Sequence, residues 1–352
     1  MKELYLGVDG GGTKTVAAIG DALGNLVGLG KGGGSNYQTV GLDGAAAGIA
    51  AAVDGALRAA GAEPGQVQAA SFALAGADFP RDFSALEGLI TARWPGLKHT
   101  IVNDTWAAWR AGSETGWGLV AIAGTGSNVG GRTESGVIKT GLGLTYEFGS
   151  RGGATHMLKD LLYHVFRAGL QAGPDTALLP MVLGAFSLVD IEALAEQLYL
   201  ATAGGGTGAA GGAPTPAGGA VESGPQSPPD AATAALNLIP ALFEVAAAGD
   251  AVARQIISEN ATALGEMTAG MARQLGLQNE EVEVVLAGSL FERPQLPLFR
   301  DAFLAALLRA VPRAWAHTPR LSAAAGAYLL GLEAGGIPVT RATIEVAARF
   351  TS

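Results

Sequence analysis

The sequence predicts an α/β protein built from two domains whose glycine-rich turns face each other across a cleft. A strand, a glycine turn and a second strand follow one another near residue 4 and again near residue 118. The chain of 352 residues is long enough for two domains of ordinary size, and its 49 % hydrophobic content can fill their cores. We therefore expect an internal duplication, with one sheet and one glycine turn in each half.

The first half is expected to form three strands followed by alternating helices and strands. Short apolar runs bounded by Gly, Asp and Asn indicate the strands, and an alanine-rich stretch indicates the first helix. The predicted elements are strands at 4–8, 15–20 and 26–30, a helix at 42–60, a strand at 69–74, a helix at 83–93, a strand at 100–102 and a helix that begins after Asn103-Asp104.

The second half repeats this order of strands and turns after Gly116 and ends in a helix rich in small residues. The predicted elements are strands at 118–123, 129–132 and 137–140, helical sequence at 231–275 with a break near Gly249, a strand at 282–286 and helices at 298–310 and 321–333. We place the first domain at 1–115 and the second at 116–332. A C-terminal helix near 333–352 could pack back on the first domain.

Residues 203–230 differ from the rest of the second half because they consist mainly of Gly, Pro, Ala and Ser. This composition has almost no bulky apolar side chains, and it predicts a disordered or loosely looped insertion. An active-site lid is the less favoured alternative, since nothing in the segment could bind a ligand selectively.

The two glycine turns predict a clamp on a polyphosphate. Because glycine has no Cβ, the backbone can turn sharply and present N–H groups to an anion, and nearby hydroxyl groups add donors. A carboxylate in the first turn can hold a phosphate-bound Mg²⁺, directly or through its water shell. The candidate residues are Asp9, Gly11, Gly12, Thr13, Lys14 and Thr15 in the first turn, with Asp9 as the metal-binding residue, and Gly124, Thr125, Gly126 and Ser127 in the second.

A tight hairpin turn is the alternative for the first glycine motif taken alone. Two observations favour ligand binding instead. The second turn stands at a matching position, and a third glycine corner, Gly288-Ser289, follows the predicted strand at 282–286. Ligands of α/β sheets bind at the carboxyl ends of the strands, so we expect all three corners to contribute to one site.

Asp104 is the candidate general base, because it ends a predicted strand of a phosphate-binding protein. An N-cap for the helix that follows is the alternative, although Asn103 could cap that helix equally well. Asn36 lies in a predicted loop at Gly34-Ser35-Asn36, where its amide could bind the hydroxyl groups of a sugar. An ordinary exposed turn residue is the alternative for Asn36.

Composition excludes several classes of function. The net charge of −9 argues against nucleic acid or an anionic membrane as the main partner. The chain has no cysteine, which removes disulfides, thiolate zinc sites and Fe–S clusters. Its four histidines show no metal-binding spacing. There is no basic and apolar leader and no apolar run of the ~18 residues that span a bilayer, so we expect a cytoplasmic protein.

The ordered set of these motifs resembles the BadF/BadG/BcrA/BcrD ATPase family, and most closely its N-acetylglucosamine kinase branch. This family belongs to the superfamily of actin, hexokinase and the heat-shock chaperone ATPases. The match runs through the first phosphate turn, Ser35-Asn36, Val102-Asn103-Asp104, the second phosphate turn and the corner at Gly288-Ser289. The family's other branch holds an Fe–S cluster with cysteines, and the absence of cysteine excludes it.

The resemblance implies two ribonuclease-H-like domains that close on ATP, Mg²⁺ and an amino sugar, above all N-acetylglucosamine phosphorylated on its 6-hydroxyl, in a homodimer. Gly288 and Ser289 would then contact the adenosine. One position departs from the family, whose kinases carry a sugar-binding aspartate where this chain has Ser150, and Glu147 is the nearby carboxylate that could replace it. The implied sugar-binding residues are Asn36, Asn103, Asp104, Glu147 and Ser150.

Two other functions remain open at this point. The first is a kinase for another sugar, such as glucosamine, glucose or a muramic-type sugar. The second is a regulator that binds ATP and sugar without turnover, which Ser150 favours and Asp104 disfavours.

Overall fold

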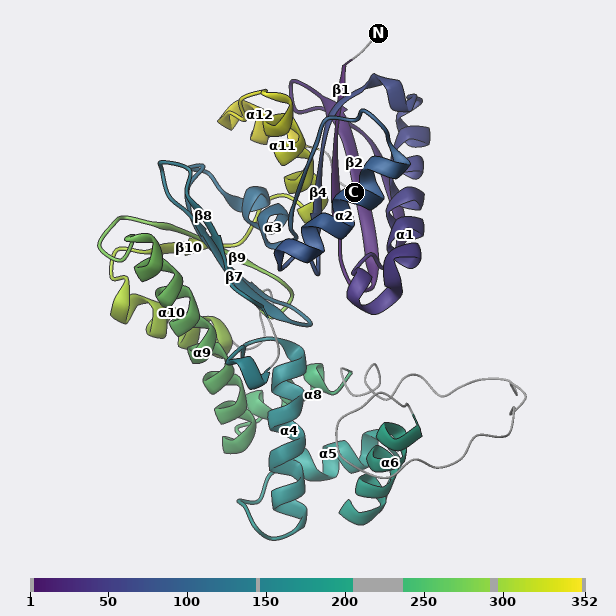
Figure 1. Ribbon diagram of the computed structural model, residues 1–352. Coiled ribbons are helices and arrows are strands. Elements are labelled where there is room, and N and C mark those ends of the chain that lie inside the picture. The colour runs from purple at the N-terminus through teal and green to yellow at the C-terminus, as the bar shows by residue number, and fades with distance from the viewer. Residues whose placement is uncertain (1–2, 144–145, 205–236, 292–296, 350–352) are drawn as a thin grey trace, which may run out of the picture.

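The protein folds around two five-stranded sheets that lie beside each other (Figure 1). The computed structural model describes residues 3–143, 146–204, 237–291 and 297–349. Nearly all of the predicted insertion at 203–230 lies outside the described residues.

The first sheet has the strand order β3-β2-β1-β4-β5. Its strands β1, β2 and β3 form the antiparallel meander, and β4 and β5 add to β1 in parallel. Helices α1 and α2 pack on one face over Leu6, Val8 and Phe72. The strands are β1 (Leu4–Gly10), β2 (Lys14–Asp21), β3 (Leu26–Gly33), β4 (Val67–Leu74) and β5 (His99–Asn103), and the helices are α1 (Tyr37–Ala60), α2 (Pro80–Arg93) and, after β5, α3 (Thr105–Gly112).

The second sheet repeats this topology with the order β8-β7-β6-β9-β10. Again the first three strands are antiparallel and the last two are parallel to the first. The predicted duplication and the α/β fold class of two ribonuclease-H-like domains are therefore confirmed. The strands are β6 (Gly118–Ala123), β7 (Ser127–Arg132), β8 (Ile138–Thr140), β9 (Glu283–Ala287) and β10 (Trp315–His317).

Helix α9 covers one face of the second sheet and α10 packs against α9, while α3 lies on the other face, between the two sheets (Figure 1). Helices α4, α5, α6 and α8 extend away from the sheets toward the bottom of Figure 1. They share one apolar core with α9 through Met157, Leu242 and Ile257. The helices are α4 (Ala154–Gly169), α5 (Leu178–Ala185), α6 (Ile191–Gly204), α8 (Leu238–Ala247), α9 (Ala251–Leu275) and α10 (Leu298–Ala310).

Helix α11 (Ala323–Gly335) returns to the first sheet and fills its second face. A Cβ added to Gly7 of β1 would lie 1.9 Å from the backbone nitrogen of Tyr328, so glycine is required for this close approach. Helix α12 (Arg341–Ala347) adds Ile344 and Ala347 to the same core. By packing, α11 therefore belongs with the first sheet, whereas the sequence analysis placed residues up to 332 in the second domain. The long-range contacts of α11 with β1 and β4 override its position in the chain.

Helix α1 is long and apolar enough to cross a membrane by length and composition. Its small residues instead pack tightly on β3, because a Cβ on Gly30 would lie 1.9 Å from the Ala52 carbonyl oxygen. Ala45, Ile49 and Ala52 have no exposed surface. The apolar face of α1 is therefore accounted for by the core of the first domain.

Candidate active site

The first glycine turn is a tight loop between β1 and β2. The Gly11 N–H donates to the Lys14 carbonyl at 2.9 Å, and the Gly11 carbonyl accepts from Ser35 N at 2.9 Å. The chain around Gly12 and Thr13 is exposed at the tip. These contacts fix the turn against the loop that leads to Asn36. The N–H groups available to a phosphate are thus those at the tip rather than that of Gly11.

Thr15 does not point toward this tip. It is fully buried, and its hydroxyl donates to the Gly33 carbonyl at 2.7 Å, which ties β2 to β3. The candidate hydroxyl donor of the first turn is therefore the exposed Thr13.

The second glycine turn joins β6 to β7 and rests on the start of α4. Ala154 N donates to the Gly124 carbonyl at 2.9 Å, and Thr155 N donates to the Thr125 carbonyl at 3.0 Å. A Cβ on Gly153 would lie 2.5 Å from the backbone of Gly126, so the helix starts in direct contact with the turn.

Two further contacts complete this corner. The hydroxyl of the buried Ser127 donates to the Arg151 carbonyl at 2.9 Å. Gly288 has a φ of +98° at the end of β9, and a Cβ there would lie 2.4 Å from the Ala123 carbonyl oxygen. The structure thus brings Gly288 and the exposed Ser289 to the second turn, where the sequence analysis expected them.

Asp104 begins α3 immediately after β5, and its side chain makes no capping hydrogen bond. Asn103 caps α3 instead, because its Oδ1 accepts a hydrogen bond from Thr105 N at 3.0 Å. The carboxylate of Asp104 is therefore not the cap of α3, although the Thr105 backbone N–H hydrogen-bonds it. The Thr105 hydroxyl in turn accepts from Asn128 Nδ2 at 3.0 Å, which connects the second glycine turn to the residue beside Asp104.

The pKa values of the two central carboxyl groups are raised. Burial is the main cause for Asp104, followed by the charges of Asp9 and Asp78, and together they raise its pKa to about 7. Burial also raises the pKa of Asp9 to about 6, against the opposing charge of Lys14. A carboxyl group whose pKa lies near neutrality is suited to proton transfer at neutral pH.

Asp78 is a member of this site that the sequence analysis missed. It follows β4, and its Oδ1 accepts from Asn103 Nδ2 at 2.9 Å. Its loop contacts the Asn36 loop, where Gln38 Nε2 lies 3.3 Å from the Gly76 carbonyl oxygen. The signal was present, since Asp78 follows the carboxyl end of a predicted strand as Asp104 does.

Asn36 is half-buried and caps α1, with its Oδ1 accepting from Gln38 N at 3.0 Å. The first glycine turn, Asn36, Asp78 and the Asn103-Asp104 pair therefore occupy one edge of the first sheet. Asp9 at the end of β1 is the carboxylate of this edge that lies beside the first glycine turn. Among the described residues, no three His, Asp or Glu side chains converge as metal ligands. This arrangement fits Mg²⁺, which is usually bound by one or two carboxylates together with substrate phosphates and water.

The corner at Ser150 lies behind the second turn. Ser150 is buried, and Arg151 beside it forms ion pairs with Asp160 at 2.5 Å and with Glu259 at 3.5 Å. Glu147 is 64 % exposed, and its Oε1 lies 3.0 Å from Lys159 Nζ. Glu147 is thus exposed and paired with a residue of α4.

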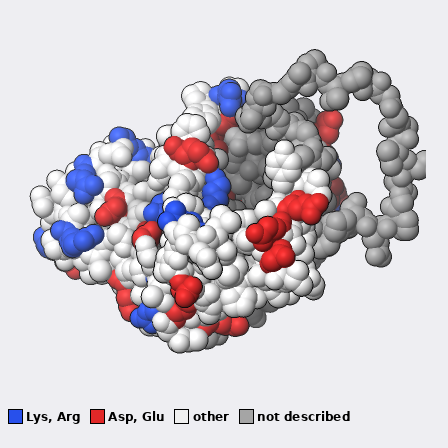
Figure 2. All heavy atoms as spheres, turned by 90° about the horizontal axis from the view of Figure 1, so that it is seen from below, with Lys and Arg blue, Asp and Glu red and all other residues white. Residues whose placement is uncertain are grey.

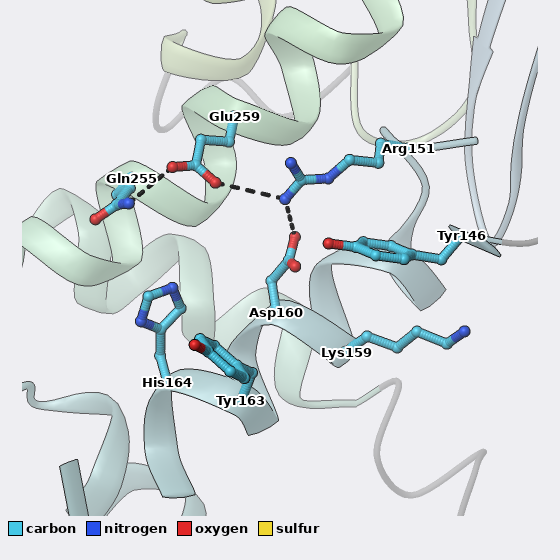
Figure 3. Close-up of a pocket in the computed structure, with 8 residues that line it drawn as sticks. All are labelled: Tyr146, Arg151, Lys159, Asp160, Tyr163, His164, Gln255 and Glu259. Carbon is cyan, nitrogen blue, oxygen red and sulfur yellow. Dashed lines mark hydrogen bonds and ion pairs between the residues drawn. The ribbon is translucent and has the colours of Figure 1, made fainter. Parts of the chain in front are cut away.

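A pocket of about 450 Å³ opens beside this corner, between the loop at 146–151 and helices α4 and α9 (Figure 3). Arg151 bridges its two acidic side chains, and the Tyr146 ring lies against the Arg151 guanidinium at 5.4 Å. The charges of the pocket are thus mostly satisfied by one another. Its lining residues are Tyr146, Arg151, Lys159, Asp160, Tyr163, His164, Gln255 and Glu259.

The two domains are joined at a buried carboxylate. The Glu283 side chain at the start of β9 is fully buried, and it accepts from Ser113 Oγ, Glu114 N and both donors of Thr115 at 2.6–3.1 Å. His317 Nε2 lies 2.9 Å from its Oε1. The segment 113–117 is the first crossing, where the chain passes from the first sheet to the second, and His317 lies just before the second crossing, where the chain returns. Glu283 therefore contacts the chain at both crossings.

The face drawn in Figure 2 carries basic and acidic side chains interspersed with large uncharged areas. The cationic side chains are therefore not gathered into one patch on that face.

The fold is thus a pair of duplicated α/β domains with glycine turns at strand ends and a carboxylate, Asp104, at the edge of the first sheet. The chain belongs to the BadF/BadG/BcrA/BcrD ATPase family, whose model matches residues 6–331. The resemblance found in the sequence is thereby confirmed. The chain is 27 % identical over 341 residues to an N-acetyl-D-glucosamine kinase of Dictyostelium discoideum, a match that covers 94 % of this chain and 98 % of that protein.

Solved structures show the same fold. A protein of Chromobacterium violaceum provisionally described as an N-acetylglucosamine kinase superposes with a TM-score of 0.67 at 19 % identity, covering 94 % of this chain and 99 % of that one. A glucokinase of the ROK family from Streptomyces griseus, in complex with glucose and AMPPNP, gives a TM-score of 0.51 at 19 % identity, with 94 % and 97 % coverage.

Proposed function

We propose that this protein is an ATP-dependent sugar kinase that transfers the γ-phosphoryl group of ATP to an amino sugar. The proposed acceptor is N-acetylglucosamine, phosphorylated on its 6-hydroxyl. The observation that carries the proposal is Asp104, a half-buried carboxylate that does not cap α3 and stands at the sheet edge of the first glycine turn. Family membership and the 27 % identity to an N-acetyl-D-glucosamine kinase support this choice of reaction and acceptor.

In this proposal both glycine turns bind the phosphates of the nucleotide. The tip of the first turn, at Gly12 and Thr13, and the second turn, at Thr125 and Gly126, can donate backbone N–H groups to the β- and γ-phosphates. Gly288 and Ser289 lie beside the second turn, and the adenosine would lie against them.

Mg²⁺ would neutralise charge that develops on the phosphates, and Asp9 would hold it directly or through its water shell. Asp104 would accept the proton of the attacking hydroxyl as the new phosphorus–oxygen bond forms. Asn36 would orient the sugar, since its amide lies on the same sheet edge as Asp104. The amide of the buried Asn103 is held by Thr105 N and Asp78, so Asn103 would act by positioning these neighbours. Closure about the crossings at Glu283 would exclude water, which otherwise competes as the acceptor.

The test is ADP release measured with a panel of acceptors, namely N-acetylglucosamine, glucosamine, glucose and N-acetylmuramic acid, with Asp104→Asn as the matched inactive control. We expect the highest kcat/KM with N-acetylglucosamine. A higher value with another sugar supports the alternative of a different sugar kinase, to which Ser150 in place of the family aspartate would contribute. ATP binding with no sugar-dependent ADP release would instead support a non-catalytic regulator.

The remaining parts of the proposal concern location and assembly. Because ATP is an intracellular metabolite, we place the enzyme in the cytoplasm, with no nucleic acid or membrane as a partner. We also propose a homodimer, on family resemblance. Light scattering of the purified protein tests this, and a mass of one chain, 35.2 kDa, would contradict it.

A further inference from the structure

Asp78 is a carboxylate close to Asp104 to which the proposed reaction assigns no task. It stands in the loop between β4 and α2, at the same sheet edge as Asp104, and it is half-buried. β4 lies between β1 and β5 in the sheet, so Asp78 follows the strand between those that carry Asp9 and Asp104.

The loop that carries Asp78 is rigidly held. Buried Asp82 accepts from the backbone N–H groups of Asp78 at 3.1 Å and Phe79 at 2.8 Å. The Tyr37 hydroxyl, from the start of α1, donates to the same carboxylate at 2.5 Å. Asp82 thus fixes the position of Asp78 relative to the start of α1 through the Asp78 backbone N–H and not through its carboxylate.

Among the described residues, the charge of Asp78 has no cationic partner. Its side chain is hydrogen-bonded by the amides of Asn103 and Gln38, and no Lys, Arg or His of the described ranges forms an ion pair with it. Burial and the neighbouring charge of Asp82 raise its pKa. A carboxylate can accept about four hydrogen bonds, and the amides of Asn103 and Gln38 use only some of these positions on the half-buried Asp78. It is therefore equipped to accept hydrogen bonds from a ligand.

We propose that Asp78 binds the acceptor sugar by accepting a hydrogen bond from a hydroxyl group that does not react. It would supply from the first domain the carboxylate that family kinases place at the position of Ser150 in the second. The inference rests on the proposed function, since it assigns a residue to the sugar site of that reaction. Asn103 donates to Asp78 and precedes Asp104, so the same contact would align the bound sugar with the general base.

This assignment replaces the one made from the sequence, in which Glu147 was the nearby carboxylate. Glu147 is largely exposed and is paired with Lys159, one of the residues that line the pocket in Figure 3. Asp78, in contrast, is bonded directly to the residue that precedes Asp104. The two carboxylates therefore offer a matched pair for an experiment.

The experiment compares Asp78→Asn with Glu147→Gln, using isothermal titration with N-acetylglucosamine and steady-state kinetics. We expect Asp78→Asn to weaken sugar binding and raise its KM by about 10- to 100-fold, the range lost with one charge-assisted hydrogen bond, while the KM for ATP stays within about twofold. Glu147→Gln is expected to change neither constant. If the Asn variant still accepts the hydrogen bond from the sugar, Asp78→Ala replaces it in the experiment, after its melting curve has been shown to be unchanged.

The 3-deoxy and 4-deoxy analogues of N-acetylglucosamine separate a contact with the sugar from a structural role. If Asp78 binds one of these hydroxyls, the analogue that lacks it binds the wild type weakly, and Asp78→Asn weakens that analogue no further. The proposal is overturned if Asp78→Asn lowers the affinity for both analogues equally. It is also overturned if Glu147→Gln lowers the affinity for the sugar and Asp78→Asn does not. Failure of the proposed function is distinguishable, because the wild type would then release no ADP with any sugar.

Discussion

Replacement of Asp104 by Asn separates the catalytic from the structural consequences of burying this carboxylate. Asn has the same shape but cannot accept a proton, so we expect kcat to fall by about 10² to 10⁴. ATP and sugar binding should stay nearly intact, because Asn103 provides the cap of α3 and the amide of the variant would keep a side-chain oxygen that can accept from the Thr105 N–H. Turnover within a few-fold of the wild type would show that Asp104 is not the base.

The same substitution is expected to stabilise the fold at alkaline pH. Burial and the charges of Asp9 and Asp78 raise the pKa of Asp104 from 3.8 to about 7. The folded protein therefore binds this proton more tightly than the unfolded chain does. The resulting stability is complete below about pH 4 and is lost as the pH rises toward 7. Above pH 7 the wild type carries the full penalty of a buried charge, and the Asp104→Asn variant carries none.

The magnitude follows from the size of the shift. Three pH units correspond to about 4 kcal/mol, which is an upper limit because Asp9 and Asp78 can themselves take up protons. We expect Asp104→Asn to raise the free energy of unfolding by about 1 to 2 kcal/mol at pH 8, and by less at pH 5. Urea denaturation of both proteins at the two pH values measures this. A variant that is less stable than the wild type at pH 8 would refute the electrostatic reasoning.

Four further substitutions test the site and the crossings at Glu283. Gly126→Val should weaken ATP binding about 10- to 100-fold without changing the melting temperature, because a Cβ there meets no protein atom within 4 Å; unchanged ATP affinity would contradict the clamp. Thr13→Val should weaken ATP binding, whereas Thr15→Val should cost only about 1 kcal/mol of stability through its bond to Gly33; the reverse pattern would contradict this division. Glu283→Gln should lower the free energy of unfolding by about 3 kcal/mol or more, measured in urea, and a neutral result would mean that the crossings do not depend on it.

Local patterns were sufficient to predict most of the fold. Apolar runs between glycine and Asx turns predicted nine of the ten strands in the described part of the chain, and the repeated order predicted two similar sheets. β10 was missed because three residues, Trp315–His317, are too short for a periodic signal. Helix α1 begins at Tyr37 rather than near 42, since Gly41, with a φ of +72°, interrupts its first turns without ending it.

The site was predictable in its motifs but less so in its partners. Side chains alternate along a strand, so the inward direction of Thr15 in β2 could have been inferred from the exposed Lys14 beside it. The position of α11 depends on contacts with β1 and β4, which no local pattern reveals. The assignment of Glu147 rested on nearness in sequence to Ser150, and such nearness does not determine which side chains a fold brings to Asp104.

The carboxylates of the proposed site are distributed unequally between the domains. Asp9, Asp78 and Asp104 all lie on strands of the first sheet or in the loops that follow them, while the second turn would contribute backbone N–H groups and the hydroxyl of the exposed Thr125. A polyphosphate alone would be repelled by the first edge, so Mg²⁺ is the component that makes that edge attractive to ATP. The acceptor sugar, which is uncharged, can bind the first domain by hydrogen bonds without the metal. The affinity for the sugar should therefore be unchanged in EDTA, whereas the affinity for ATP should fall. Calorimetry of each ligand in EDTA measures both affinities. A site that is assembled only when both domains are closed would instead lose affinity for both ligands.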